Sequence, residues 1–341
     1  MKIAIVKTSA LGDIIHASFI PSILKKAFPQ SSIDWFVTRD LAEILEDNPY
    51  IDQIVSLPYH SQANAWQTIK GLLQIRHHDD EYDMIFDLQS LIKSAAISYL
   101  LKGKSVGFTQ RGCREWLACY FYDKTHDIAY QDSVFKRNAF LFQEEFRKIR
   151  YKNNILTKQE KYLFYKKEQS PNLSNILLPN HFNILIFPGA SNIKKTYPAF
   201  KYIHLIQSIP PQTACNIIIG WGNNKEREIA KNIQRRCQGN IRIKALNKRY
   251  RYRELKALID QVNMVIGSDT GPVHMAWALR TPSITLFSDD NPAKPERNHP
   301  KTPINTALSA EHMNLIKTSD ILKNLLSIMK KFSKASEPEY A

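Results

Sequence analysis

Asp13 stands where a carboxylate could act as a base. It follows the first apolar run, Lys2–Val6, and a helix is expected to begin at it, after a tight turn allowed by Gly12. Asp13 and His16 are three residues apart, so both side chains would project from one face of the first helical turn. A carboxylate at the carboxyl end of a strand suits a general base, and the alternative is that Asp13 only caps the helix.

A second candidate site is the sequence GSDTGPVH at 267–274. It follows an apolar run and precedes a helix, with a proline early in that helix, where no N–H donor is needed. Free backbone amides at such a helix start bind phosphate or diphosphate, and the helix dipole favours the negative charge. The alternative is an ordinary Asp-Thr-Gly turn followed by a core histidine.

Two more loops follow strands. The loop 187–198 contains Ser191 and Lys195, which could hold a leaving phosphate, although a solvated turn is the alternative. In the segment Trp221–Glu226, the glutamate opens a helix and could bind a pair of ribose hydroxyls. The alternative for Glu226 is an acid that only stabilises the first turn of a helix.

Several motifs are missing from the sequence. It has no G-x-G-x-x-G after a strand and no G-x-x-x-x-G-K-[ST], which argues against nicotinamide and P-loop phosphate sites. It also has no D-x-D pair, so we expect no carboxylate-held metal on a diphosphate. The expectation is an activity that requires neither a metal nor another cofactor.

The formal net charge is +15, which favours a polyanionic partner: nucleic acid, an anionic membrane face or a phosphate-bearing substrate. A nucleic-acid-binding protein would use the basic residues Arg235, Arg236, Lys248, Arg249, Arg251 and Arg253, but no recognition module is visible. No apolar run approaches the ~18 residues that span a bilayer. We therefore expect a cytoplasmic protein without a transmembrane segment or signal peptide.

These candidate residues sit in a pattern of short apolar runs that alternate with longer helical segments, twice over. The expected strands of the first half are Lys2–Val6, Ile33–Thr38, Ile51–Leu57, Tyr82–Leu88 and Ser105–Phe108, and those of the second are Phe182–Phe187, Asn216–Gly220, Ile241–Leu246, Met264–Gly267 and Ile284–Phe287. The expected helices are Asp13–Lys26, Leu41–Asp47, Ala63–Arg76, Ile92–Leu101, Ala199–Ser208, Lys225–Arg236, Arg253–Asp260, Pro272–Leu279 and Ser319–Phe332, and 132–167 is expected to be mainly helical. Such alternation predicts βαβ units and parallel sheets.

The best linker candidate is Glu168–Pro179, which is rich in Pro, Asn and Ser. We therefore predict a first Rossmann-like domain over 1–170 and a second over 171–318, followed by a helix and tail over 319–341 that cross back onto the first half. An active site is expected in a cleft between the halves, facing the carboxyl ends of the strands.

The sequence resembles the ADP-heptose:lipopolysaccharide heptosyltransferases. The segments that carry the resemblance are VKTSALGDIIHA at 6–17, DLQSLIKSAA at 87–96 and SDTGPVHMAWALRTPSITLF at 268–287, and 113–134 is similar to heptosyltransferase I of the WaaC type. The resemblance implies an α/β protein of the GT-B fold. It also implies inverting transfer of L-glycero-D-manno-heptose from ADP-heptose to the first Kdo of Kdo₂-lipid A, on the inner face of the inner membrane.

The resemblance also assigns roles to residues. It implies that Asp13 is the catalytic base. The donor-binding residues that it implies are Ser191, Lys195, Glu226, Asp269, Thr270, Gly271 and His274. The acceptor-binding residues are Lys7, Thr8, Lys93 and Arg114. The sequence departs from the family pattern where Ala190 and Ser191 replace two threonines and Tyr197 replaces a tryptophan, so the contacts of that loop are the least defined. The remaining alternative within the family is a later-acting heptosyltransferase with another core sugar as acceptor.

Overall fold

The structure is a computed structural model that describes residues 1–146, 148–149, 160–190, 192–237, 239, 241–290 and 294–335. It divides into two compact units, Met1–Lys166 and Lys167–Ala341. The division falls close to the linker expected from the sequence.

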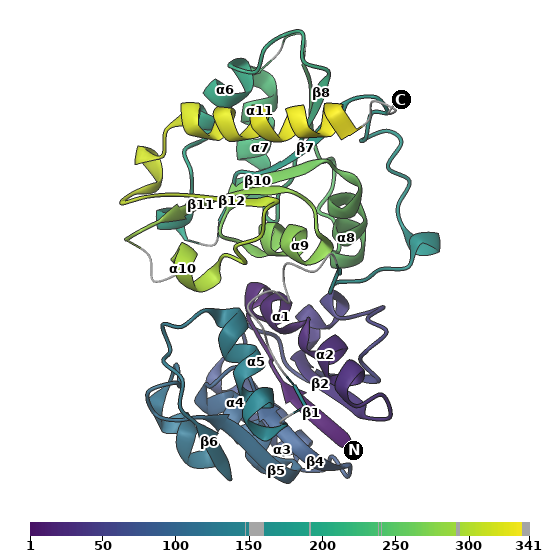
Figure 1. The fold of residues 1–341 in the computed structure, drawn as a ribbon, viewed down its shortest axis with the longest axis vertical. Coiled ribbons are helices and arrows are strands. Elements are labelled where there is room, and N and C mark those ends of the chain that lie inside the picture. Colours follow the sequence, from purple (N-terminus) through teal and green to yellow (C-terminus); the bar gives the residue numbers. More distant parts are fainter. Residues whose placement is uncertain are drawn as a thin grey trace. The chain divides into compact units, whose positions relative to one another are not determined.

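The first unit is built on a parallel sheet with the strand order β3-β2-β1-β4-β5-β6 (Figure 1). Its strands are β1 (Lys2–Val6), β2 (Ser32–Thr38), β3 (Gln53–Leu57), β4 (Glu81–Asp87), β5 (Lys102–Phe108) and β6 (Lys124–His126). The residues Ile3 to Val6 of β1 are fully buried between β2 and β4, as expected for a strand covered on both faces. From β1 to β3 the strands are added toward one edge of the sheet, and from β4 to β6 toward the other, so the strand order reverses between β1 and β4. Ligands of doubly wound sheets bind at such a point, beyond the carboxyl ends of the strands.

Two of the expected helices at the start of the first unit take another form. They are α1 (Leu11–Ala17), α2 (Ile20–Ala27), α3 (Ala65–Ile75), α4 (Ile92–Leu100) and α5 (Val134–Glu145), with 3₁₀ helices η1 (Arg39–Ile44) and η2 (Trp116–Phe121). The single helix expected over Asp13–Lys26 is broken into α1 and α2, because Pro21 at the start of α2 cannot continue the hydrogen-bond pattern of α1. The helix expected at Leu41–Asp47 is the shorter η1.

The second unit repeats this topology, with the order β12-β11-β10-β7-β8-β9. Its strands are β7 (Phe182–Phe187), β8 (Cys215–Ile219), β9 (Arg242–Ala245), β10 (Met264–Ser268), β11 (Ser283–Ser288) and β12 (Asn305–Ala310). In chain order within the unit this is again 3-2-1-4-5-6, and the reversal lies between β7 and β10. Both units are therefore Rossmann-like, as the sequence predicted.

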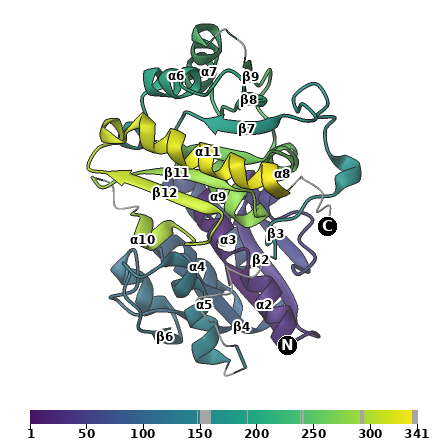
Figure 2. The ribbon, with the colours of Figure 1, turned by 45° about the horizontal axis from the view of Figure 1, so that its top comes forward.

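The second unit has the helices α6 (Ala199–Gln207), α7 (Asn224–Arg236), α8 (Tyr252–Gln261), α9 (Gly271–Leu279), α10 (Pro295–Asn298) and α11 (Thr318–Ala335), with η4 (Lys167–Gln169), η5 (Ile193–Lys195) and η6 (Met313–Leu315). The last helix, α11, packs against α6, β11 and β12 (Figures 1 and 2). We expected 319–341 to lie outside the second domain, as a helix and tail that cross back onto the first half. The structure instead counts α11 in the second unit, where Ile321 and Leu325 are buried in its core.

Two strands and one segment also differ from the expectation. The strands β6 and β12 were missed. Of the expected helical segment 132–167, the structure describes a helix only over Val134–Glu145, residues 160–166 are not helical, and 147 and 150–159 lie outside the described residues. Among the described residues, no helix combines the length and the apolarity required to cross a bilayer.

Candidate functional site

The loop after β1 is tied to the loop after β4 at the reversal point of the first sheet. The ammonium group of Lys7 donates to the carbonyl oxygen of Leu88 at 2.6 Å. The backbone N–H and the hydroxyl of Thr8 both donate to Oε1 of Gln89, at 2.6 and 2.7 Å. Lys7 is 5% exposed and Thr8 is fully buried. The contacts of these two predicted acceptor residues therefore support a role in positioning the loop that leads to Asp13.

A buried carboxylate holds Gln89 in turn. Asp87 accepts hydrogen bonds from the backbone N–H of Gln89 at 2.7 Å, from the Ser94 hydroxyl at 2.7 Å and from the Tyr122 hydroxyl at 2.8 Å. Burial raises the pKa of Asp87, and its hydrogen bonds oppose that rise only in part. Neither Asp87 nor Gln89 was given a role from the sequence, because the role depends on the pairing of two loops that are distant in the chain.

Asp13 is the third residue of α1, half-buried, and it is not the N-cap of the helix. The N-cap is Ala10, and no side chain caps this helix. The alternative that Asp13 serves as an N-cap is therefore wrong. His16 does not share an open face with Asp13, since it is 2% exposed and its ring lies 5.0 Å from that of Phe135. Gly12 is also helical, so it does not form a turn.

Lys93 and Arg114 lie close enough for their charges to interact. Lys93 is the second residue of α4, and Arg114 is exposed in the segment before η2, where its backbone N–H donates to the Ser90 hydroxyl at 3.2 Å. Burial lowers the pKa of Lys93, the charge of Glu115 opposes this change, and the charge of Arg114 adds to it. Neither basic side chain forms an ion pair with a described residue. The structure thus brings together two of the predicted acceptor-binding residues.

In the second unit, Asp269 is the centre of a buried charged cluster that follows β10. It is 6% exposed, and its carboxylate contacts Nζ of Lys195 at 2.8 Å and Nε2 of His274 at 2.8 Å. Burial alone would raise the pKa of Asp269, but the hydrogen bond and attraction from His274 and the charge of Lys195 outweigh burial and hold it well below its usual range. The cluster joins the loop after β7 to the start of α9.

The helix α9 begins at Gly271, with Thr270 as N-cap. The hydroxyl of Thr270 donates to the carbonyl oxygen of Ser268 at 3.2 Å, so it does not cap the helix. His274 is stacked on Trp277, with ring centroids 4.5 Å apart. The first turn of α9 therefore presents a partly positive helix end next to Lys195, a combination that suits a diphosphate.

Glu226 lies in the first turn of α7 and against the loop after β7. Its carboxylate accepts from the backbone N–H of Gly222 at 2.6 Å and from the side-chain amide of Asn223 at 2.9 Å. A Cβ atom on Gly189 would lie 2.3 Å from Cγ and Cδ of Glu226. Because Gly189 has no side chain, the side chain of Glu226 can pack directly against its backbone. Ser191, a predicted donor residue in the same loop, lies outside the described residues.

Two residues near Asp269 were missed from the sequence. The side-chain amide of Asn298 lies 3.4 Å from Oδ2 of Asp269. His299 is 7% exposed, and its Nδ1 accepts from the backbone N–H of Lys301 at 3.2 Å. Burial, followed by the charge of Lys301, lowers the pKa of His299 to about 4, so this histidine is neutral at neutral pH.

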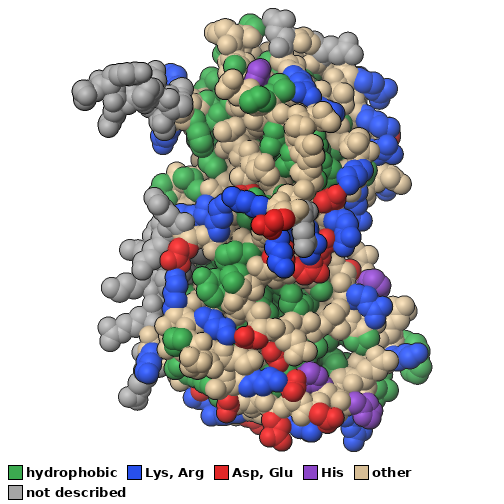
Figure 3. Space-filling model, turned by 90° about the vertical axis from the view of Figure 1, so that its right-hand side faces the viewer, with side chains coloured by type: hydrophobic (Ala, Val, Ile, Leu, Met, Phe, Trp, Pro, Cys, Tyr) green, Lys and Arg blue, Asp and Glu red, His purple; other side chains and the backbone are tan. Residues whose placement is uncertain are grey.

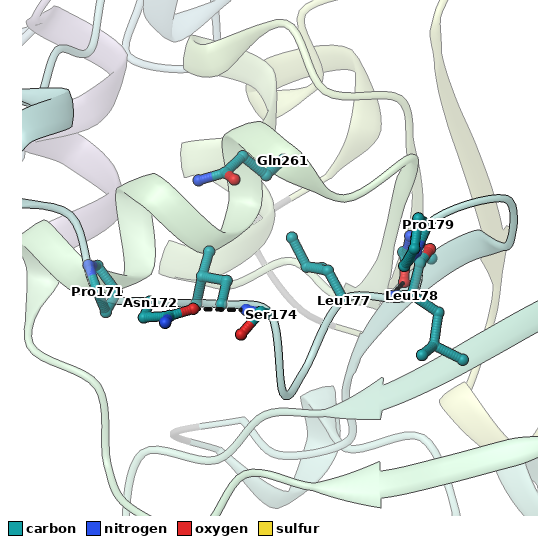
Figure 4. Close-up of a pocket in the computed structure, with 9 residues that line it drawn as sticks. Pro171, Asn172, Ser174, Leu177, Leu178, Pro179 and Gln261 are labelled. Carbon is teal, nitrogen blue, oxygen red and sulfur yellow. Dashed lines mark hydrogen bonds between the residues drawn. The ribbon is translucent and has the colours of Figure 1, made fainter.

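A cavity of about 550 Å³ lies elsewhere in the second unit (Figure 4). It is lined by Pro171, Asn172, Leu173, Ser174, Leu177, Leu178, Pro179, Asn183 and Gln261. Most of these residues precede β7 or begin it, so the cavity lies at the amino edge of the sheet, opposite to Lys195 and Asp269. Among the described parts of the chain, no group of three or more His, Cys, Asp or Glu side chains could hold a metal ion.

Solved structures contain the same succession of two Rossmann-like units. Heptosyltransferase WaaC of E. coli with ADP is 22% identical with a TM-score of 0.73, over 97% of this chain and 99% of that one. The glycosyl transferase family 9 structure from Veillonella parvula is 15% identical with a TM-score of 0.80, over 97% of both chains. The protein therefore has the GT-B fold of glycosyltransferases.

The family follows from sequence comparison. Residues 74–325 match Glycosyltransferase family 9 (heptosyltransferase). Lipopolysaccharide heptosyltransferase 1 of Campylobacter coli is 34% identical over 316 residues, 89% of this chain and 88% of that protein. That of Pseudomonas aeruginosa is 25% identical over 298 residues, 86% of this chain and 80% of that protein. The chain belongs to glycosyltransferase family 9 and is an enzyme.

The family also decides against the alternative of a non-enzymatic nucleic-acid-binding protein. In the face drawn in Figure 3, Lys and Arg side chains are spread over both units and intermingle with Asp and Glu. Lys248, one of the basic residues named for that alternative, forms an ion pair with Glu254.

Proposed function

We propose that the protein moves L-glycero-D-manno-heptose from ADP-heptose to the first Kdo of Kdo₂-lipid A, with inversion at the anomeric carbon. The observation that carries the proposal is the cluster of Lys195, Asp269 and His274 beside the start of α9. Support also comes from relatives named lipopolysaccharide heptosyltransferase 1 and from similar structures that contain ADP and ADP-2-deoxy-2-fluoro heptose.

The second unit is the proposed donor site. The diphosphate of ADP-heptose would lie against the start of α9 at Thr270 and Gly271, with Lys195 and His274 beside it. Negative charge develops on the diphosphate as the glycosidic bond breaks. Fixed amides and a lysine held in place by Asp269 stabilise that charge without having to reorganise. Glu226 would bind the ribose hydroxyls from the first turn of α7.

The first unit is the proposed acceptor site, with Asp13 as base. A carboxylate is a weak base for an alcohol, so proton transfer occurs late, once the acceptor oxygen has begun to bond to the sugar. A single displacement needs only one carboxylate, whereas a retaining route would need a nucleophile as well. Lys93 and Arg114 would bind the phosphates and carboxylates of the acceptor. That acceptor places the enzyme in the cytoplasm, at the inner face of the inner membrane.

The direct test is to incubate the protein with ADP-heptose and Kdo₂-lipid A and to measure the acceptor by mass spectrometry. The expected result is the addition of one heptose. The same acceptor already carrying its first heptose is the matched comparison. If heptose is transferred only to the acceptor that already carries its first heptose, the proposal is contradicted and the protein is a later-acting heptosyltransferase.

We expect transfer to persist in excess EDTA. In the proposed site Lys195 and the amides of α9 carry out the charge stabilisation that a metal would otherwise provide. The measurement is the initial rate of ADP release with and without the chelator. A complete loss of rate that added magnesium restores would show that the diphosphate needs a metal.

Replacing Lys93 or Arg114 by alanine should raise the KM for the acceptor and leave the Kd of ADP-heptose unchanged. Hydrogen bonds to charged groups contribute ~1.5–3 kcal/mol each, which corresponds to a roughly 10- to 150-fold rise. The matched control is Lys136→Ala, since Lys136 is a surface lysine of the same unit that pairs with Asp132 at 3.2 Å. A weaker donor Kd with an unchanged acceptor KM would mean that the two units have been assigned the wrong substrates.

Gly189→Ala should weaken ADP-heptose binding about tenfold, because the new methyl group displaces the Glu226 carboxylate and a hydrogen bond to a charged group is lost. Isothermal titration of ADP-heptose measures the effect. Gly239→Ala is the control, since its Cβ would meet nothing within 4 Å. Equal affinity of the two variants for ADP-heptose would show that Glu226 does not bind the donor.

A further inference from the structure

The helix α3 of the first unit carries an apolar stripe that no described part of its unit covers. Trp66 is 74% exposed, Ile69 is 49% exposed and Leu73 is 59% exposed. Their spacing of three and four residues places them on one face of the helix. Large apolar side chains grouped in this way on a surface mark an interaction site.

The opposite face of α3 is fixed to the sheet, so the helix cannot turn its stripe inward. A Cβ on Gly71 would lie 2.3 Å from Cδ1 of Tyr59, which shows how closely the helix backbone approaches that ring. Ile75 is 6% exposed and Leu72 is partly buried in the same core cluster as Tyr59. A capping box between Asn64 and Gln67 fixes the start of the helix.

The segment that contains the stripe has basic charges and no acidic ones. Residues 53–78 contain no Asp or Glu, whereas Lys70 and Arg76 are exposed and form no ion pair with a described residue. A helix with Trp, Ile and Leu on one face and basic side chains beside them has the composition of helices that lie in the surface of an anionic bilayer.

A second group of exposed aromatic side chains lies in the same unit, on elements that pack next to α3 or one element further away. The helix α3 packs against α4, and α4 packs against η2. Tyr99 on α4 is 69% exposed, and Trp116 and Tyr120 on η2 are 52% and 73% exposed. Trp and Tyr are the side chains that favour the membrane–water interface. Both α3 and α4 begin after the carboxyl end of a strand, so Trp66 and Lys93 lie toward the same edge of the sheet.

We propose that the stripe Trp66, Ile69 and Leu73 lies in the headgroup region of an anionic lipid bilayer, with Lys70 and Arg76 against the lipid phosphates. A second copy of this chain is the less suitable occupant, because it would bring one positively charged surface against another in a protein of net charge +15. The inference rests on the proposed function for the identity of the membrane, and it would bring the acceptor-binding residues to the surface where the acceptor resides.

The test is sedimentation of the full chain with vesicles that contain no lipid A. Vesicles of phosphatidylcholine mixed with phosphatidylglycerol should bind the protein, and vesicles of phosphatidylcholine alone should bind it much more weakly. Trp66→Ser and Leu73→Ser should each weaken binding about tenfold through lost apolar burial. Lys70→Gln and Arg76→Gln should each weaken it about fivefold at low salt, and less at high salt.

Phe200→Ser is the matched control. Phe200 is 64% exposed on α6 of the second unit, so its replacement removes an equally exposed aromatic side chain without touching α3. The control should bind like the wild type. All variants should unfold at the same temperature, since the replaced side chains are exposed. A second readout is tryptophan fluorescence, whose shift to shorter wavelength on anionic vesicles should be smaller in Trp66→Phe than in the wild type, while that protein still sediments.

Three results would overturn the inference: no binding to the anionic vesicles, equal binding of the α3 variants and the wild type, or a wild-type dimer that Trp66→Ser converts to a monomer. Heptose transfer to Kdo₂-lipid A dispersed in detergent separates this inference from the proposed function. If the wild type transfers heptose in detergent but does not bind vesicles, only the inference fails. If it binds vesicles but transfers no heptose, only the proposed function fails.

Discussion

Replacing Asp13 by asparagine is expected to lower kcat by ~10²- to 10⁴-fold, the usual contribution of a general base. The variant keeps the shape of the side chain and loses only the ability to accept the proton of the acceptor hydroxyl. Asp13 is suited to this role because it is half-buried in the first turn of α1 and does not cap the helix. The affinity for ADP-heptose should remain unchanged, since the proposed donor residues belong to the second unit.

The measurement is the single-turnover rate with Kdo₂-lipid A, together with the Kd of ADP-heptose. Losing a negative charge near the N-terminus of α1 should lower the free energy of unfolding by ~0.3–1 kcal/mol, which leaves the protein folded. Asp132→Asn is the control, since Asp132 pairs with Lys136 on the surface of the same unit. A near-wild-type kcat in Asp13→Asn would show that Asp13 is not the base and that another residue accepts the proton.

The predicted fold depended on strands whose side chains are mainly apolar. The boundaries of β1 and β7 were predicted to the residue, because both are mainly apolar and buried on two faces. The strand β6 was missed because its sequence, KTH, is polar and forms an edge that pairs only with β5. The strand β12 was missed for a similar reason, since NTALSA is weakly apolar and lies at the edge beside β11. Edge strands bury less, so composition identifies them less well.

The candidate site was predictable where one loop carries the chemistry, and not where two loops meet. The sequence identified Asp269 and Lys195 separately, and the structure joins them in an ion pair. The sequence could not show that Thr8 is buried and forms a hydrogen bond with Gln89. These two residues are 81 positions apart, and the parallel pairing of β1 with β4 brings them together. His16 was misplaced for a similar reason, since α5 covers it with Phe135.

Asp269→Asn is expected to weaken ADP-heptose binding about 100-fold, through Lys195 and His274. In the wild type, the carboxylate fixes the ammonium group of Lys195 at 2.8 Å and the ring of His274 at 2.8 Å. The amide keeps the shape of the side chain but removes the charge, so the lysine loses the partner that aims it at the diphosphate. The loss of an aimed, charge-assisted contact corresponds to ~3 kcal/mol at most. Titration calorimetry with ADP-heptose measures this change.

The same substitution should lower the free energy of unfolding of the second unit by about 3 kcal/mol, since breaking a buried ion pair leaves the partner without its counter-charge. Hydrogen exchange in β10 and α9 measures the change in that unit alone. The control is Glu228→Gln, which removes a surface pair with Lys231 at 3.4 Å and should cost about 0.5 kcal/mol or less. Equal protection of β10 in the two variants would contradict a stabilising role for the cluster.

The pH dependence follows from the lowered pKa of Asp269. A carboxyl group with a folded-state pKa below its unfolded value of ~3.9 stabilises the protein above that value, and this stability is lost as the pH falls toward the folded-state pKa. The difference in unfolding free energy between wild type and Asp269→Asn should therefore stay constant from about pH 7 to about pH 5, and shrink below about pH 4. If the difference in unfolding free energy already disappears near pH 6, the charge of Asp269 is not what stabilises the cluster. The protonation of a neighbouring group would then control the stability of the cluster.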